Sequence, residues 1–415
     1  FIFNPLPWKR RTIMDWPAEF SAPAAMPSVV DAREQGGTRL LTEIPAGGFA
    51  WLTEAKEGKT PVRLESARRG KPLAEDLLLR NQIFEVQLSQ NTGGIASVTF
   101  HNQRGNRVSQ QLAFRYEQSR TFVLDEQEKT TSYAGPRLVS SRVTQSGPMI
   151  GEIEVTGQIT DLQTGDVLAG FRQTVTVERD SGRIRLRIDF DDIPRMPAGN
   201  PWMTYYASRF AWENEAASIT RGMLGQARGF RMERFEAPDY VEIADSDTRL
   251  AIVPHGRPYH RRSGHRMLDS LLVVEGETQR SFEFTLDFDQ NYPMRVASEI
   301  QQPLIVNHIA DRRPSGADSG WILGTSARNV IIARLRCVGT ESEPRITLLL
   351  EETDGNLVPL YTVLDQGQEW LDDRYECFTL DHFECGVRGM TMDPSNNIFI
   401  TYGKCSDAQP MKEGP

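Results

Sequence analysis

Three of the six histidines lie close together in the sequence, where they could act as metal ligands or as hydrogen-bonding groups. His255, His260 and His265 are spaced five residues apart within the stretch 254–266. On a strand this spacing places successive side chains on opposite faces, so they could meet at a metal ion only in a loop. Four arginines in the same stretch would repel a cation. The stretch is better suited to binding the hydroxyls or a carboxylate of a substrate, or it is a basic loop exposed to solvent.

A dense group of aromatic residues precedes the histidines. Five aromatic side chains fall within the fourteen residues 199–212. Rings with polar tips can stack on the apolar faces of sugars and bind their hydroxyls, as a saccharide cleft requires. Aromatic residues also fill the cores of ordinary β-sandwiches, and on the residues alone the core is the favoured interpretation.

Two acidic doublets, Asp191-Asp192 and Asp372-Asp373, could in principle supply the acid and base of glycoside hydrolysis. Adjacent residues on a strand point to opposite faces, so neither doublet forms a facing pair, and we expect both to cap turns. The sequence has no G-x-S-x-G, phosphate-loop, dinucleotide-binding or H-E-x-x-H motif. It therefore lacks the minimal residues of an α/β-hydrolase, a nucleotide-binding protein or a zincin metalloprotease.

The bulk composition favours a soluble globular protein with a neutral substrate. The net charge of −9 and the pI near 5.4 argue against nucleic acid as a partner, and no apolar run approaches the roughly 20 residues of a membrane span. The four cysteines show no C-x-x-C spacing, and free thiols are favoured over two bridges: Cys337, Cys377, Cys385 and Cys405. The compartment is left open, with the cytoplasm slightly favoured.

The elements that would position these residues are strands. Apolar residues alternate with polar ones in 183–190, 282–288, 152–155 and 172–178, and Gly, Asn and Asp clusters separate such runs. Helical periodicity is hard to find beyond one or two turns. The pattern predicts an all-β protein built as an antiparallel sandwich, and a length of 415 residues predicts two or three domains. We expect a small β domain at 1–68, a large sandwich at 69–300 and a C-terminal sandwich at 301–415.

Eight stretches, taken in order, resemble the C-terminal region of bacterial family 38 glycoside hydrolases, the α-mannosidases. Their order along the chain makes the resemblance more specific than any one match, and it covers residues 1 to about 300. The stretches are residues 3–11, 79–86, 92–97, 111–115, 200–212, 234–238, 258–264 and 266–269. The chain starts at Phe1 without an initiator Met, and we expect it to be a segment of a longer protein.

The resemblance implies a fold and a division of labour. Family 38 enzymes are retaining glycosidases whose zinc is held by aspartates and histidines in an N-terminal α/β domain, where the site begins with His-x-Asp. A helical bundle joins that domain to a C-terminal β region similar to the galactose-mutarotase supersandwich. This sequence contains no His-x-Asp. The resemblance therefore implies that the chain has no catalytic residue, metal ligand or cofactor of its own, and that zinc belongs to a missing catalytic domain.

In the family the β region also lends side chains, including a tyrosine and an arginine, to the rim of the catalytic cavity. The resemblance thus predicts a mannose-containing glycan and the N-terminal catalytic domain of the parent protein as partners. The predicted substrate-binding residues are those in the matching motifs: Tyr205, Tyr206, Arg209, Tyr259, His260, Arg261 and Arg262.

Two other functions remain open on the sequence. One is a non-catalytic β-sandwich module that binds a glycan or stabilises a partner. The other follows from the likeness to mutarotases, since an aldose epimerase would need a His and a Glu facing one sugar. His260 with Glu236 or Glu242 is the candidate pair.

Overall fold

The computed structural model is nearly all β, as the alternating pattern predicts, and describes residues 1–34, 37–55, 59–63, 72–121, 127–191, 193, 196, 199–309, 317–321, 323–325, 328–340, 343–353, 362–364, 376–378, 387–392 and 398–402. Asp192, Asp372 and Asp373 lie outside these residues, as do the side chains of all four cysteines. The all-β antiparallel fold is therefore confirmed, whereas the turn-capping and thiol predictions stay predictions.

The chain forms two compact units. The terminal unit comprises Phe1–Ser66, Gly225–Ala227 and Met294–Pro415, and the central unit comprises Ala67–Leu224 and Arg228–Pro293. The division into three domains at 68 and 300 stays a prediction.

The central unit is one continuous ladder of antiparallel strands that closes on itself through the pairing of β9 with β10. Its strands are β6 (Ala74–Glu75), β7 (Leu78–Arg80), β8 (Phe84–Leu88), β9 (Ile95–Phe100), β10 (Ser109–Thr121), β11 (Gln127–Ser146), β12 (Ile150–Asp161), β13 (Val167–Glu178), β14 (Arg183–Phe190), β15 (Tyr205–Ala211), β16 (Ser218–Met223), β18 (Arg234–Glu236), β19 (Tyr240–Ala244), β20 (Arg249–Val253), β21 (Tyr259–Gly264), β22 (Met267–Val273) and β23 (Ser281–Phe288). Strand β17 (Gln226–Gly229) belongs to the same sheet but includes residues of both units.

The core of this unit is made by the alternation seen in the sequence. In β14 the side chains of Ile184, Leu186 and Ile188 are fully buried, and they stand opposite Leu286, Phe284 and Phe282 of β23. The intervening arginines and carboxylates of both strands face the other side. A large main core of aliphatic and aromatic side chains results, and burial of this apolar surface is the dominant force that holds the strands together.

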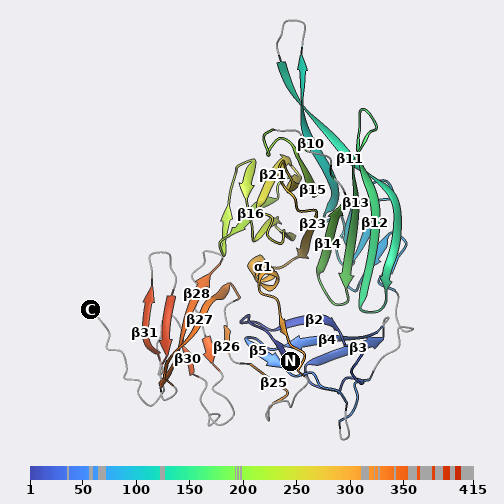
Figure 1. The fold of residues 1–415 in the computed structure, drawn as a ribbon. Helices are drawn as coiled ribbons and strands as arrows, with labels where there is room; N and C mark the ends of the chain where they lie inside the picture. Colours follow the sequence, from blue (N-terminus) through green and yellow to red (C-terminus); the bar gives the residue numbers. More distant parts are fainter. Residues whose placement is uncertain are drawn as a thin grey trace. The chain divides into compact units, whose positions relative to one another are not determined.

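Strands β10 and β11 are longer than the strands beside them. β10 pairs with β15 only as far as Arg115, and β11 pairs with β12 only from Ala134 onward. Beyond these points β10 and β11 pair with each other, and Figure 1 shows this hairpin extending past β12 and β13. Arg115 and Tyr133 are paired neighbours at its base, so the base of the hairpin borders the end of β15.

One buried polar contact lies inside the apolar core. The side chains of Gln110 on β10 and Gln173 on β13 exchange two amide hydrogen bonds, at 3.2 and 3.1 Å. Gln110 also donates to the Ser208 hydroxyl, and Gln173 donates to the carbonyl oxygen of Gly93. Both amides are almost fully buried and each has its partners, as buried polar groups require.

The turn between β8 and β9 depends on two consecutive glycines. Gly93 has a φ of +74°, a conformation that residues with a Cβ rarely adopt. At Gly94 a Cβ atom would lie 2.1 Å from the backbone oxygen of Gln110 on the neighbouring strand. Glycine is therefore required at Gly94 for the close approach of the turn to β10.

We expect Gly94→Ala to lower the free energy of unfolding by about 1–2 kcal/mol, because the added methyl group must push β9 and β10 apart. Urea denaturation of the full chain measures the effect. The control is Gly229→Ala, a strand glycine that, like Gly94, has no positive φ but has open space around its Cβ position. An equal loss in both variants would show that the close approach to Gln110 does not govern the preference for glycine at Gly94.

The terminal unit contains smaller antiparallel sheets. Two four-stranded sheets run in the orders β24-β1-β5-β25 and β27-β28-β32-β31, and two three-stranded sheets in the orders β2-β4-β3 and β26-β29-β30. The strands are β1 (Ile2–Phe3), β2 (Arg10–Asp15), β3 (Val29–Glu34), β4 (Thr38–Ile44), β5 (Gly48–Ala50), β24 (Ile305–Val306), β25 (Ser319–Trp321), β26 (Leu323–Thr325), β27 (Val330–Thr340), β28 (Glu343–Glu352), β29 (Thr362–Leu364), β30 (Glu376–Phe378), β31 (Val387–Met392) and β32 (Ile398–Tyr402).

A single helix, α1 (Pro293–Gln301), is found among the described residues, and it begins with proline, which is suited to the first turn of a helix. The Trp8 indole donates a hydrogen bond to Glu299 on this helix, and Arg10 donates to the carbonyl oxygens of Glu299 and of Gln302, the residue that follows the helix. In the described part of the chain, no helix has the length and hydropathy of a membrane span.

Candidate functional site

The sheet formed by β10, β15, β22 and β21 has two chemically different faces. One face carries Tyr206 and Phe210 into the main core. The other carries Tyr205 and Ala207 into a small separate cluster with Leu271. We call this second side the outer face, and define it by Arg115, Tyr205, Arg209, Tyr259, Arg261 and Asp269. Side-chain alternation along β15 therefore divides the predicted aromatic motif between core and outer face.

A buried ion pair lies at the centre of the outer face. The strand register aligns Arg209 on β15 with Asp269 on β22 and Arg261 on β21. Asp269 is fully buried and accepts hydrogen bonds from Arg209 Nε at 2.6 Å and Nη2 at 2.9 Å. The Tyr205 hydroxyl donates to the same carboxylate at 2.8 Å. This bidentate geometry fixes the Arg209 guanidinium in one orientation.

The electrostatics of this group follow from its burial. Burial, followed by the charge of Asp269, raises the pKa of Tyr205 well above its ordinary value, so the phenol stays protonated and donates. For Arg209, burial alone would lower the pKa, but the hydrogen bonds and charge of Asp269 outweigh it and raise the pKa. Arg209 also lies over the Tyr133 ring, with its guanidinium carbon 4.8 Å from the ring centre.

Arg261 and two aromatic residues form the more open part of the outer face. Arg261 donates to Glu233 at 2.7 Å and to the carbonyl oxygen of Trp202 at 2.7 Å. Tyr259 is 47% exposed, and its ring stands edge-on to the Trp202 indole with 5.7 Å between centres. An exposed aromatic ring next to fixed guanidinium donors is the combination that suits a sugar ring.

Three of the predicted substrate-binding residues lie elsewhere. Tyr206 is 2% exposed and stacks on Phe114, and burial raises its pKa to about 12. His260 is fully buried and stacks on Phe235. Arg262 follows Arg261 on β21, and the only side-chain bond found for it among the described residues is a long one, 3.5 Å, to the carbonyl of His265. Tyr206 and His260 therefore support the sheet from the core side, and substrate contact by any of these three stays a prediction.

The histidines do not converge. His260 lies with Nε2 3.2 Å from the carbonyl oxygen of Ala237 and Nδ1 3.0 Å from the Ser270 hydroxyl. His255 bonds Thr285 on β23, and His265 lies beside Glu215 at the surface. Within the described residues, no three His, Cys, Asp or Glu side chains gather as a set that could hold a metal ion.

The epimerase pair is likewise not formed. His260 faces the core beside Phe235, whereas Glu236, the next residue on β18, is paired with Tyr259. Glu242 is bonded to Arg249 at 2.8 Å. His260 is fully buried against the core while Glu236 is exposed, so these two side chains do not face one sugar.

The buried position of His260 makes stability depend on pH. Burial lowers its pKa to about 4, below the ordinary value of 6.5, so the unfolded chain binds a proton more readily than the folded chain. The stabilisation is complete above pH 6.5 and is lost as the pH falls towards 4. We expect His260 to account for a loss of about 2 kcal/mol between pH 7 and pH 5.

Urea unfolding at both pH values, for the wild type and for His260→Gln, measures this contribution. The variant should show a smaller fall in stability between pH 7 and pH 5 than the wild type. His265→Gln, whose side chain is 85% exposed, should leave the pH dependence unchanged. If both variants keep the wild-type slope, other groups cause the acid sensitivity.

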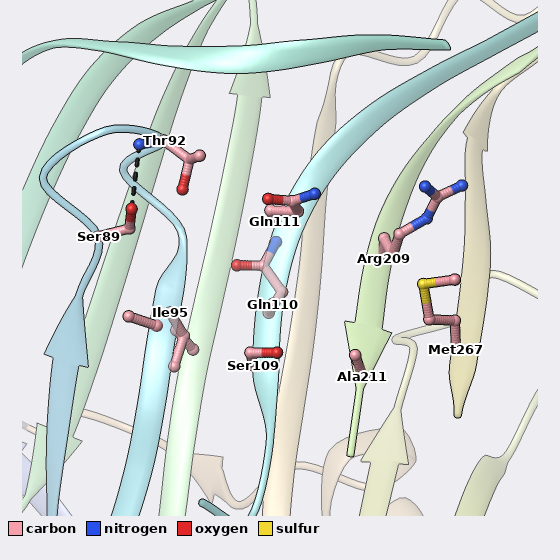
Figure 2. A pocket seen from close by; sticks show the side chains of 10 residues that line it. Ser89, Thr92, Ile95, Ser109, Gln110, Gln111, Arg209, Ala211 and Met267 are labelled. Atoms are coloured by element: carbon pink, nitrogen blue, oxygen red, sulfur yellow. Dashed lines mark hydrogen bonds between the residues drawn. The ribbon is translucent and has the colours of Figure 1, made fainter. Parts of the chain in front are cut away.

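A cavity of about 250 Å³ adjoins Arg209. Figure 2 shows the turn residues Ser89 and Thr92 on one side, Ser109 and Gln111 of β10 in the middle, and Arg209 with Met267 on the other. Its lining combines hydroxyl, amide and guanidinium groups with a thioether. The volume is slightly below the range of about 300–1,000 Å³ typical of small-molecule sites, so the cavity suits one small polar ring.

Comparison with known proteins identifies relatives by structure only. No protein-family model and no curated protein sequence matches this chain. Among solved structures, an α-mannosidase from Enterococcus faecalis V583 is similar with a TM-score of 0.56 and 9% sequence identity, over 94% of this chain and 51% of that chain. A glycosyl hydrolase family 38 protein from Enterococcus faecalis is similar with a TM-score of 0.55 and 9% identity, over 95% of this chain and 52% of that one.

The fold is that of one half of these enzymes. The chain spans about half the length of both solved relatives, while they account for nearly all of this chain. At 9% identity the likeness shows a shared fold and does not transfer an activity. The shared fold agrees with the family resemblance of the sequence motifs. It does not distinguish a bacterial subtype of the family.

Proposed function

We propose that this chain is the β half of a family 38 α-mannosidase and that its outer face lines part of a substrate cavity. The proposal rests on one observation above all: nearly the whole chain superposes on about half of two such enzymes. The sequence motifs that resemble the family include the strands that carry Tyr205, Arg209 and Asp269. The outer face therefore lies on strands that resemble the family, and it carries an ordered group of hydrogen-bond donors.

In this proposal the outer face holds the sugar and performs no bond cleavage. Tyr259 and Trp202 offer aromatic edges and faces, and Arg261 offers donors held in place by Glu233. Retaining hydrolysis needs two carboxyl groups roughly 5 Å apart across the glycosidic bond. The proposal assigns those carboxyl groups and the zinc ion to a catalytic domain outside this chain, in keeping with the resemblance of the sequence to the C-terminal region of the family.

The test is to express the complete reading frame that contains this chain and to assay an aryl α-mannoside. Hydrolysis that a zinc chelator abolishes is the expected result, and the 415-residue chain alone should show none. Enzyme-like turnover by the chain alone with zinc added would contradict the division of labour. A reading frame that encodes no catalytic domain, with mannoside binding retained, would favour the non-catalytic glycan-binding module.

A further inference from the structure

Three guanidinium groups converge on a single sulfur atom at the edge of the outer face. Arg115 Nη1 and Arg261 Nη1 each lie 3.6 Å from Met203 Sδ, and Arg234 Nη2 lies 3.4 Å from it. The three arginines come from β10, β21 and β18. We call these three residues the arginine triad. A thioether is only a weak hydrogen-bond acceptor, so it satisfies little of what three guanidinium groups can donate.

The arginine triad carries excess positive charge. Arg261 is paired with Glu233, but neither Arg115 nor Arg234 forms an ion pair within the described part of the chain. Arg115 is only 4% exposed, bonds neutral partners alone, and has a buried Nε without any hydrogen-bond partner. Guanidinium groups remain charged, and a buried charge without a counter-ion is costly. Three cations and one carboxylate leave the site with a net charge of +2.

The position of the arginine triad relates it to the sugar-facing groups. Arg115 is the paired neighbour of Tyr205, and Arg261 is the paired neighbour of Asp269. Arg234 is exposed, whereas Arg115 is buried and the Arg261 side chain is 12% exposed, so solvent reaches the triad at Arg234. A phosphate group carries about −1.5 to −2 charges at pH 7 and three acceptor oxygens, which match both the excess charge and the number of donors. Arginine is the residue that binds phosphate with directed, paired hydrogen bonds.

We infer that the arginine triad binds the phosphate of a phosphorylated sugar, and that the Met203 thioether occupies the position of this phosphate in the free chain. The inference deepens the proposed function, because it assigns a class of substrate to the same face. It rests on the proposed function only for the sugar part of the ligand, since the phosphate site is defined by the arginines alone.

Isothermal titration calorimetry of the full chain at low ionic strength tests the inference with three probes: mannose 6-phosphate, inorganic phosphate and methyl α-mannoside. Both phosphate compounds should bind, and mannose 6-phosphate more tightly than methyl α-mannoside. Arg234→Gln should weaken the binding of both by about tenfold, because a charge-assisted hydrogen bond is lost from an exposed position. The matched control is Arg142→Gln, whose side chain is 71% exposed and paired with Glu154.

A second variant tests the role of the sulfur. Met203→Ala opens the space between the three guanidinium groups and should tighten phosphate binding severalfold. The inference is overturned by absence of phosphate binding, by equal binding in Arg234→Gln and wild type, or by weaker binding in Met203→Ala. These results are independent of hydrolysis: phosphate binding without mannosidase activity of the full reading frame contradicts only the proposed function, and activity without phosphate binding contradicts only this inference.

Discussion

Asp269→Asn is expected to lower the free energy of unfolding by about 3–5 kcal/mol, the cost of removing one partner from a buried ion pair. The carboxylate is fully buried and neutralises Arg209, whose side chain is 14% exposed. An asparagine has one oxygen in place of two and no charge, so it cannot satisfy Arg209 and Tyr205 together. Urea denaturation at pH 7 measures the loss.

The control for this prediction is Asp189→Asn. Asp189 is paired with Arg187 on the solvent side of β14, where the two side chains are 25% and 56% exposed. Exposed pairs contribute about 0–1 kcal/mol, so this variant should be nearly as stable as the wild type. A loss below about 1 kcal/mol in Asp269→Asn would show that the ion pair between Asp269 and Arg209 contributes no more to stability than an exposed pair.

Arg261→Gln is expected to lower kcat/KM for an aryl α-mannoside by about 10- to 100-fold in the protein expressed from the full reading frame. Loss of a charged hydrogen bond to substrate costs about 1.5–3 kcal/mol, which corresponds to this range. Arg261 is partly exposed and its partner Glu233 is at the surface, so the variant should remain folded.

Arg142→Gln is again the matched control, because it removes an exposed arginine from β11 without changing the outer face. Its kcat/KM should equal that of the wild type within about twofold, since surface substitutions change little. Circular dichroism of both variants shows that the fold is retained. Equal activity of Arg261→Gln and the wild type would remove Arg261 from the substrate cavity.

The sequence predicts the strands of this protein well because their pattern is local. The alternation in 183–190 and 282–288 corresponds to β14 and β23, and the two strands are direct neighbours. Where one face of a strand packs against the core and the other meets solvent, apolar and polar residues must alternate with a period of two. The helix α1 is harder to foresee, because at nine residues it spans only about two and a half turns.

The site is less predictable because it depends on pairing between strands that are distant in the chain. Tyr205 and Arg209 were included among the predicted residues, but Asp269, which holds both of them, was not. One signal was present: Asp269 interrupts the apolar run of β22, and a charge within such a run needs a buried partner. Arg115, Tyr133 and Met203 join the outer face through the register of β10 and β11 and the turn before β15, which no local pattern specifies.

The amide pair between Gln110 and Gln173 has a consequence for how accurately the outer face is built. Its two hydrogen bonds form in only one alignment of β10 against β13, and a slip of either strand would leave both amides unsatisfied in an apolar interior. Gln110 lies between Ser109 and Gln111, which line the cavity beside Arg209. The pair therefore fixes one wall of the cavity directly, because Gln110 is itself among the residues that line it.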